Sequence, residues 1–145
     1  MDYGLLRVLV VDDEQFSRFA VGTVLRLLGV KKVVEARDGA SAMEAYAAFW
    51  PHLVICDLEM KPVDGMTFLR LLKEQEKHLH RVAPVIFLTV HAEGHLVHQA
   101  MELGAAGYLV KPVKAPQLKK RMDSLLANTP DLYGDLPRDD GPAAG

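Results

Sequence analysis

The stretch VICDLEMKPVDG, residues 54–65, gives the clearest indication of the fold. A continuous apolar run, typical of a strand buried on both faces, ends there in Asp57, and a loop with proline and glycine then leads into a helical pattern. The same change from apolar run to helical period recurs along the chain. Apolar, β-branched runs predict five strands, at residues 5–11, 30–36, 52–56, 83–90 and 107–110.

Helical periods fill the segments between and after these runs. In the first segment, three- and four-residue intervals predict an amphipathic helix that carries Phe16, Phe19, Ala20, Val24, Leu27 and Leu28 and stops at Gly29. Four more helices are predicted at residues 38–50, 65–77, 94–103 and 115–127. In the helix at 65–77, Phe68, Leu69 and Leu72 are predicted to face inward. Strict alternation of strand and helix predicts an α/β fold, a doubly wound five-stranded parallel sheet with five helices.

Length and composition indicate one globular domain. The chain has 145 residues, of which 50% are hydrophobic and 25% charged, which suffices for a buried core. Its 17 Lys and Arg against 19 Asp and Glu give a net charge of -2, so direct binding of nucleic acid is not expected. Neither a membrane span nor a signal peptide is recognisable, and we expect a cytoplasmic protein without membrane contact.

The end of the chain has a different composition. Residues 128–145 are rich in proline, glycine and aspartate and show no periodicity. Such a segment buries too little apolar surface to fold, and we expect a flexible C-terminal tail. Residues 1–127 would then form the single folded domain.

Polar side chains gather where the predicted strands end. Asp12 and Asp13 follow the first strand, Asp57 the third, and Thr89 and Lys111 close the fourth and fifth. In doubly wound sheets, ligands bind beyond the carboxyl ends of the strands. Three adjacent carboxylates repel one another, and a hard dication such as Mg²⁺ relieves that repulsion. Alternatively, the two acids after the first strand cap a helix, and both roles can coexist.

The joint pattern resembles a known family. VLVVDDE (8–14), VICDLEMKPVDG (54–65), FLTVHA (87–92) and GYLVKP (107–112) are similar to motifs of the receiver domain of bacterial two-component response regulators. The likeness is closest to single-domain receivers of the chemotaxis-regulator type, with a flavodoxin-like receiver fold. The resemblance implies a phosphorylation-dependent switch in a two-component phosphorelay. It implies no enzymatic activity other than self-phosphorylation and autodephosphorylation.

The resemblance also implies roles for single residues. Asp57 would accept a phosphoryl group from a sensor histidine kinase or a histidine phosphotransfer protein. Asp12, Asp13 and Asp57 would hold Mg²⁺ together with the main-chain carbonyl of Glu59. Lys111 and the hydroxyl of Thr89 would contact the phosphoryl group, and the Lys111–Pro112 peptide would be cis.

A switch needs an element with two states that favour different partners. The resemblance assigns this role to Tyr108, which would turn inward as the Thr89 hydroxyl moves toward phosphate; alternatively, Tyr108 is an ordinary strand aromatic. The downstream protein would dock on the face of the fourth helix, fifth strand and fifth helix. That face includes His95, Lys119 and Lys120, although lysines on a helix are often simply solvated.

The sequence departs from the family pattern at several positions. The common Asp-x-x-Met-Pro-x-Met-Asp-Gly has its proline one place later here, so that Lys61 precedes Pro62. Lys61 either adds a cation at the site or is a solvated loop lysine. Val90 replaces the usual Ala or Gly, and we expect it to narrow access to the phosphoryl group. Glu59 and His91, two places after the predicted acceptor and hydroxyl, are expected to modulate phosphoryl lifetime.

Three other functions compete with this interpretation. A phosphatase of the haloacid-dehalogenase type also forms a phosphoaspartate, but usually has Asp where Glu59 stands and needs a longer chain. A nucleotide- or flavin-binding module would need a glycine-rich phosphate loop, which is missing. A receiver-like module that binds partners without phosphorylation would not need the intact acids, Thr89 and Lys111.

Overall fold

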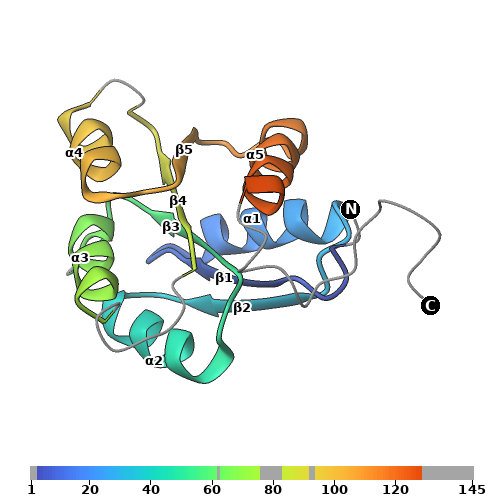
Figure 1. Ribbon diagram of the computed structural model, residues 1–145, viewed down its shortest axis with the longest axis horizontal. Helices are drawn as coiled ribbons and strands as arrows, with labels where there is room; N and C mark the ends of the chain where they lie inside the picture. Colours follow the sequence, from blue (N-terminus) through green and yellow to red (C-terminus); the bar gives the residue numbers. More distant parts are fainter. Residues whose placement is uncertain (1–2, 62, 76–82, 92–93, 129–145) are drawn as a thin grey trace.

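The computed structural model describes residues 3–61, 63–75, 83–91 and 94–128. Within them, strands and helices alternate as the sequence predicts (Figure 1). The elements are β1 (Arg7–Val11), α1 (Gln15–Leu27), β2 (Lys32–Ala36), α2 (Gly39–Phe49), β3 (Leu53–Asp57), α3 (Gly65–Gln75), β4 (Val85–Thr89), α4 (His95–Leu103), β5 (Gly107–Val110) and α5 (Ala115–Asn128).

The strands form one parallel sheet in the order β2-β1-β3-β4-β5, which confirms the predicted fold class. After β1 the chain adds β2 on one side, and from β3 it adds β4 and β5 on the other side, so the strand order reverses between β1 and β3. In the register, Val11 pairs with Cys56, and Thr89 pairs with Val110. The carboxyl ends of the strands are therefore level, and ligand sites of such sheets lie at this reversal.

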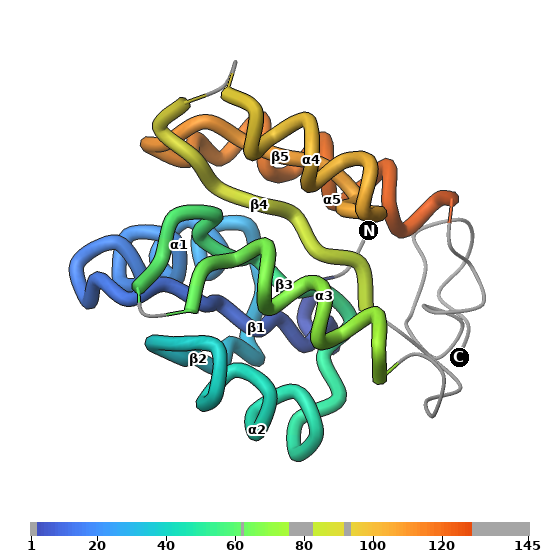
Figure 2. The backbone as a smooth tube through the Cα atoms, turned by 90° about the vertical axis from the view of Figure 1, so that its left-hand side faces the viewer, coloured from blue at the N-terminus to red at the C-terminus, as the bar shows by residue number. Residues whose placement is uncertain are grey.

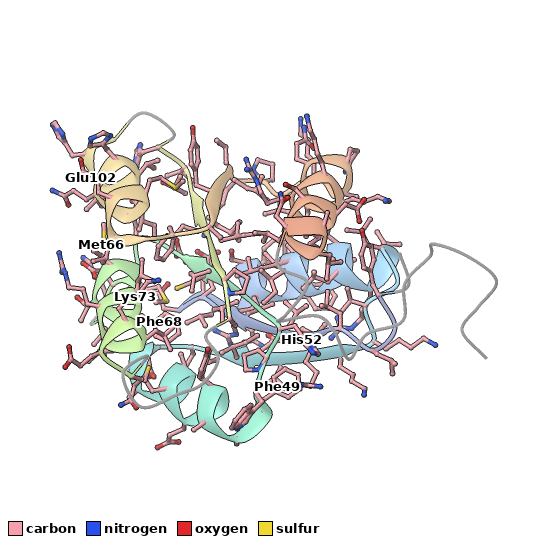
Figure 3. The ribbon with its side chains drawn as sticks, in the orientation of Figure 1. Phe49, His52, Met66, Phe68, Lys73 and Glu102 are labelled. Atoms are coloured by element: carbon pink, nitrogen blue, oxygen red, sulfur yellow. The ribbon has the colours of Figure 1, made fainter. Side chains whose placement is uncertain are left out.

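Helices cover both faces of the sheet. One buried cluster joins the sheet to α2, α3 and α4, and the other joins it to α1 and α5. Figure 1 shows the sheet between these two layers, and Figure 2 looks onto the side of α3. Met66 and Phe68 on α3 are buried in the first cluster (Figure 3), and burying one such side chain contributes about 1.5–3 kcal/mol. Phe68, Leu69 and Leu72, the positions predicted to face inward, are all buried, so this prediction is confirmed.

The apolar face predicted for α1 is only partly the buried one. Phe16, Phe19 and Leu27 are 76%, 64% and 77% exposed, whereas Val21 and Leu25 are buried against the sheet, with Gly22 between them. The helix carries two apolar stripes. The prediction was wrong for these three exposed residues and missed Val21 and Leu25, because packing against the sheet selects the stripe with the smaller side chains.

Two predicted boundaries shift slightly. Helix α5 continues through Asn128, one residue beyond the predicted domain end. Helix α3 is described to Gln75, so its predicted last residues and the tail at 129–145 lie outside the described residues. No helix in the described part of the chain is long and apolar enough to cross a membrane.

Both edges of the sheet are short. The edge strand β2 has five residues and exposes Lys32 and Glu35. The opposite edge strand, β5, has four residues. Charged and short edge strands oppose pairing with strands of other molecules.

Gly65 leaves no room for a side chain at the start of α3. A Cβ at this position would lie 2.6 Å from the carbonyl oxygen of Asp57 and 2.7 Å from Cε1 of Phe87. We therefore expect Gly65→Ala to lower the free energy of unfolding by about 1–3 kcal/mol, as overpacking does. Urea unfolding of both proteins measures the difference.

Gly22→Ala in α1 is the matched control. Its Cβ would meet the flexible end of Arg26, at 3.1 Å. Alanine also favours a helix interior over glycine by up to about 1 kcal/mol, so stability should stay equal or rise. Equal losses in the two variants would show that crowding at Gly65 is not the cause.

Candidate functional site

Three carboxylates meet at the carboxyl ends of β1 and β3. Asp12, Asp13 and Asp57 each offer an oxygen within 4.8 Å of the others, and they are the one such group of three found in the described residues. Asp12 and Asp57 are 1% and 6% exposed, whereas Asp13 is exposed. The sequence prediction that these acids come together is confirmed. Oxygen ligands of this kind suit a hard divalent cation.

Main-chain N–H groups orient all three carboxylates. Asp12 accepts a hydrogen bond from Glu14 at 2.9 Å, Asp57 from Glu59 at 3.2 Å and Asp13 from Lys61 at 3.1 Å. Glu14 is the N-cap residue of α1 and makes no side-chain cap of its own. The bond from its N–H to Asp12 lets this acid stabilise the start of the helix while it also faces the other carboxylates.

Lys111 places one positive charge among these acids. Its Nζ lies 3.1 Å from Oδ2 of Asp12 and 3.4 Å from Oδ2 of Asp57. The Lys111–Pro112 peptide is cis, as the resemblance implies. Burial acts to lower the pKa of Lys111, but the contacts with Asp12 and Asp57 outweigh burial and raise that pKa. The ammonium group therefore stays charged.

Asp57 sits in a less favourable setting for its own charge. Burial is the largest influence and raises the pKa of Asp57, and the nearby charge of Asp12 adds to it. The hydrogen bond from Glu59 and the contact with Lys111 act in the opposite direction without cancelling the rise. The hydrogen bond thus orients the Asp57 carboxylate, but its neighbours do not fully offset the cost of burying its negative charge.

The hydroxyl of Thr89 donates its hydrogen bond to Glu59 and not to Asp57. The buried Thr89 donates from Oγ1 to Oε1 of Glu59 at 2.9 Å. The main-chain N–H of His91 donates to the same Oγ1 at 3.0 Å, and the His91 imidazole lies 3.8 Å from Glu59. The sequence placed Glu59 and His91 near the site but did not predict this bond.

Tyr108 and Val90 occupy different surroundings. Tyr108 is half-buried and packs against the cluster of α2, α3 and α4, which agrees with a switch and with an ordinary strand aromatic. Val90 is 60% exposed. With Lys111 and Pro112 it lines a groove of about 410 Å³ that runs along α1.

Arg18 is a site residue that the sequence reasoning missed. Its guanidinium donates to the main-chain carbonyl of Asp12 at 2.6 Å and to Oε1 of Glu35 at 3.2 Å. It therefore ties the end of β1 to the neighbouring strand β2. Its place one helical turn after Glu14 was the available signal.

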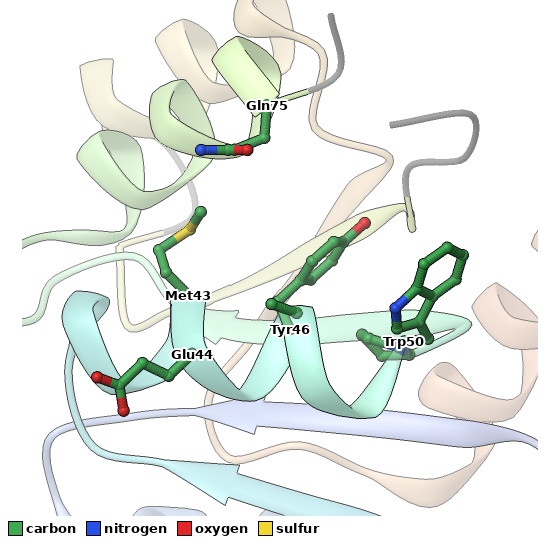
Figure 4. A pocket seen from close by; sticks show the side chains of 7 residues that line it. Met43, Glu44, Tyr46, Trp50 and Gln75 are labelled. Carbon is green, nitrogen blue, oxygen red and sulfur yellow. The ribbon is translucent and has the colours of Figure 1, made fainter. Parts of the chain in front are cut away.

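A second hollow lies at the opposite end of β3, far from the acids. It measures about 500 Å³ and is lined by Met43, Glu44, Tyr46, Ala47, Trp50, Pro51 and Gln75 (Figure 4). Trp50 adopts a left-handed backbone conformation, φ 53°, at the end of α2. None of the predicted site residues lines this hollow.

Comparison with known proteins gives the family. Residues 8–123 match the model of the response regulator receiver domain. The chain belongs to the response regulator receiver domain family. Receiver domains are phosphorylation switches of two-component signalling, and this receiver belongs to that class of function. The match supports neither the phosphatase nor the phosphorylation-independent module.

Relatives and solved structures agree with this assignment. The receiver is 32% identical to the chemotaxis protein CheY of Bacillus subtilis over 83% of this chain and 97% of the relative. It is 35% identical to CheY of Treponema pallidum, over 83% and 82%. CheY4 of Vibrio cholerae has a similar structure, with a TM-score of 0.72 and 27% identity over 83% and 98% of the chains. The CheX–CheY–BeF3–Mg²⁺ complex of Borrelia burgdorferi matches with 0.74 and 27%, over 83% and 89%.

The raised pKa of Asp57 predicts a pH-dependent effect of Asp57→Asn. Above the ordinary carboxyl pKa, the folded wild type must hold a charge that burial disfavours, and asparagine removes that charge. We expect the variant to be more stable than wild type at pH 7 in EDTA. The difference should shrink as the pH falls toward about 4, where the carboxyl group of the unfolded chain also binds its proton.

Urea unfolding at several pH values tests this. Glu44→Gln, which removes an exposed charge far from the acids, is the control and should show no comparable gain at pH 7. A less stable Asp57→Asn at pH 7 would mean that the ion pair with Lys111 outweighs burial.

Proposed function

We propose that Asp57 is the phosphoacceptor of this receiver. The observation that carries the proposal is its buried carboxylate, which lies 3.4 Å from the ammonium group of Lys111 and beside two further acids. A phosphoryl group has a high negative charge during transfer, so that positioning and neutralisation account for most of the catalysis. Lys111 is already in place to supply positive charge.

The transfer balances without a further reactant. An Asp57 oxygen attacks the phosphorus of a phosphohistidine, the P–O bond forms, the P–N bond breaks, and the donor histidine recovers its electron pair. The product is an acyl phosphate, and water later cleaves it to aspartate and inorganic phosphate. The receiver thus modifies itself and acts on no outside substrate.

Mg²⁺ is the cofactor that we assign to the acid group. Asp12, Asp13 and Asp57 would hold it with the main-chain carbonyl of Glu59, a set of oxygen ligands that suits this ion. Bound Mg²⁺ supplies positive charge to the phosphoryl oxygens. Arg18 would keep the Asp12 segment in place through its bond to the main-chain carbonyl.

The hydroxyl of Thr89 would connect phosphorylation to the surface. Glu59 holds it before phosphorylation, and a phosphoryl oxygen on Asp57 would compete for the same proton. Movement of Thr89 would allow Tyr108 to turn inward, because β4 and β5 are neighbours with Phe87 paired to Tyr108. The two states then present different surfaces to partners.

The downstream partner would dock on the face of α4, β5 and α5. A groove of about 450 Å³ on this face is lined by Tyr108, Leu109, Val110, Lys111, Pro112, Lys114, Gln117 and Arg121. His95 and Lys120 are exposed on the same face, and Lys119 lies beside Asp123 and over the ring of Tyr3. The basic character of the groove favours an acidic segment of the target protein.

The phosphodonor, a histidine kinase or histidine phosphotransfer protein, would approach over α1. Phe16 and Val90 line one groove together with Lys111, which also contacts Asp57. Exposed Phe19 extends this apolar surface along the helix. Large exposed apolar patches are typical of protein interaction sites. The signalling unit would extend through Asn128, where α5 ends. The tail beyond it and the cytoplasmic location stay predictions.

Phosphorylation by a small donor tests the proposal. With Mg²⁺ and acetyl phosphate, the wild type should gain the mass of one phosphoryl group, because Asp57 can attack this donor as it attacks phosphohistidine. Asp57→Asn should gain nothing, and intact-mass spectrometry distinguishes the two. An adduct that persists in the variant, or steady turnover of p-nitrophenyl phosphate by the wild type, would contradict the assignment.

Glu59→Ala should speed phosphorylation by acetyl phosphate about two- to tenfold. The substitution frees the Thr89 hydroxyl and removes a negative charge that repels the anionic donor, an effect of about 1 kcal/mol at close range in water. Time courses by mass spectrometry give the rates of phosphate gain and loss.

Glu59→Gln separates the two causes, because glutamine keeps an oxygen acceptor for Thr89 but has no charge. His91→Ala keeps the main-chain donor to Thr89 and should change the rate of phosphate loss less than Glu59→Ala does. Unchanged gain and loss in Glu59→Ala would refute a modulating role for this carboxylate.

A further inference from the structure

Asp13 differs from the other two acids in its exposure. Asp12 and Asp57 are buried and contact Lys111, whereas Asp13 is exposed. Repulsion from two neighbouring carboxylates would favour rotation of an exposed aspartate toward water. Its oxygen nevertheless lies within 4.8 Å of the ligand oxygens of the other two acids.

A main-chain group of the β3–α3 loop holds this carboxylate. The N–H of Lys61 donates to Oδ2 of Asp13 at 3.1 Å, although the two residues are far apart in the sequence. This bond exists because the proline of the loop is at position 62 and not at 61. Proline has no N–H and could not donate.

The same loop orients a second acid. Glu59, two residues before Lys61, donates its main-chain N–H to Asp57 at 3.2 Å. Two N–H groups of one short segment therefore bind acids at the carboxyl ends of two different strands, β1 and β3. Each bond uses part of the acceptor capacity of a carboxylate, which has about four lone-pair sites, and leaves the rest for a cation.

We propose that the main-chain N–H of Lys61 is a positioning group of the metal site. It holds Asp13 beside Asp12 and Asp57 before the cation arrives, so that binding need not first overcome the outward rotation of this carboxylate. The Lys61 side chain has no part in this. The inference rests on the proposed function, in which these three acids bind Mg²⁺.

Two substitutions at one position separate the main chain from the side chain. Lys61→Ala keeps the N–H and removes the cation, whereas Lys61→Pro removes both. Proline suits this place in the chain, because a residue that precedes Pro62 is already confined to extended or polyproline conformations.

Calorimetric titration of the full chain with Mg²⁺ is the measurement. We expect Lys61→Ala to bind like wild type and Lys61→Pro to bind about three- to tenfold more weakly, as the loss of one solvent-exposed hydrogen bond to a charged group implies. Equal weakening in both variants, or no weakening in Lys61→Pro, overturns the inference and leaves the metal site intact. Failure of wild type to bind Mg²⁺ overturns the metal site and the inference together.

A second measurement does not depend on the proline variant. In wild type without Mg²⁺, the amide proton of Lys61 should show the downfield NMR shift and slow exchange of a proton bonded to a carboxylate. In Asp13→Ala, both signs should disappear, while the amide of Glu59 should keep them through Asp57. An amide of Lys61 that is the same in both proteins overturns the inference.

Discussion

The repulsion among three carboxylates is the constraint on which the rest of the site depends. The parallel register of β1 and β3 brings Asp12, Asp13 and Asp57 together, and the ammonium group of Lys111 contacts two of them. One cation does not balance three anions. The remaining negative charge favours a divalent cation, and in the proposed metal site the main-chain N–H groups would hold the acids in place before it binds.

In the proposed function, Thr89 would connect this charge balance to the surface of the receiver. Its buried hydroxyl can give its proton to one acceptor at a time, and in this structure that acceptor is Glu59. In the proposed function, a phosphoryl group on Asp57 would compete with Glu59 for this proton, because its oxygens would carry more charge than a single carboxylate. Because β4 pairs with β5, movement of Thr89 would then reach β5, which borders the proposed docking groove.

Much of the fold and of the site could be predicted from the sequence. Apolar runs that alternate with helical periods predicted the sheet and its helices, and the acids at the strand ends predicted the group around Asp57. The buried stripe of α1 could not be predicted, because Phe16 and Val21 both fit the helical period and only packing distinguishes them. The hydrogen bonds from Lys61 to Asp13 and from Arg18 to the main-chain carbonyl of Asp12 were also missed. Each involves a main-chain group, and every residue type carries a main-chain carbonyl, so the residue type alone does not indicate such bonds.

The two short edges of the sheet limit how this receiver can report its state. An outside strand would have to pair with β2, where Lys32 and Glu35 project, or with the four residues of β5. Addition of a strand is thus a poor route for recruiting a partner. Partners would then bind to helical surfaces. There, small displacements of side chains can alter the shape of the surface without breaking the hydrogen bonds between strands, so partners can exchange quickly and reversibly.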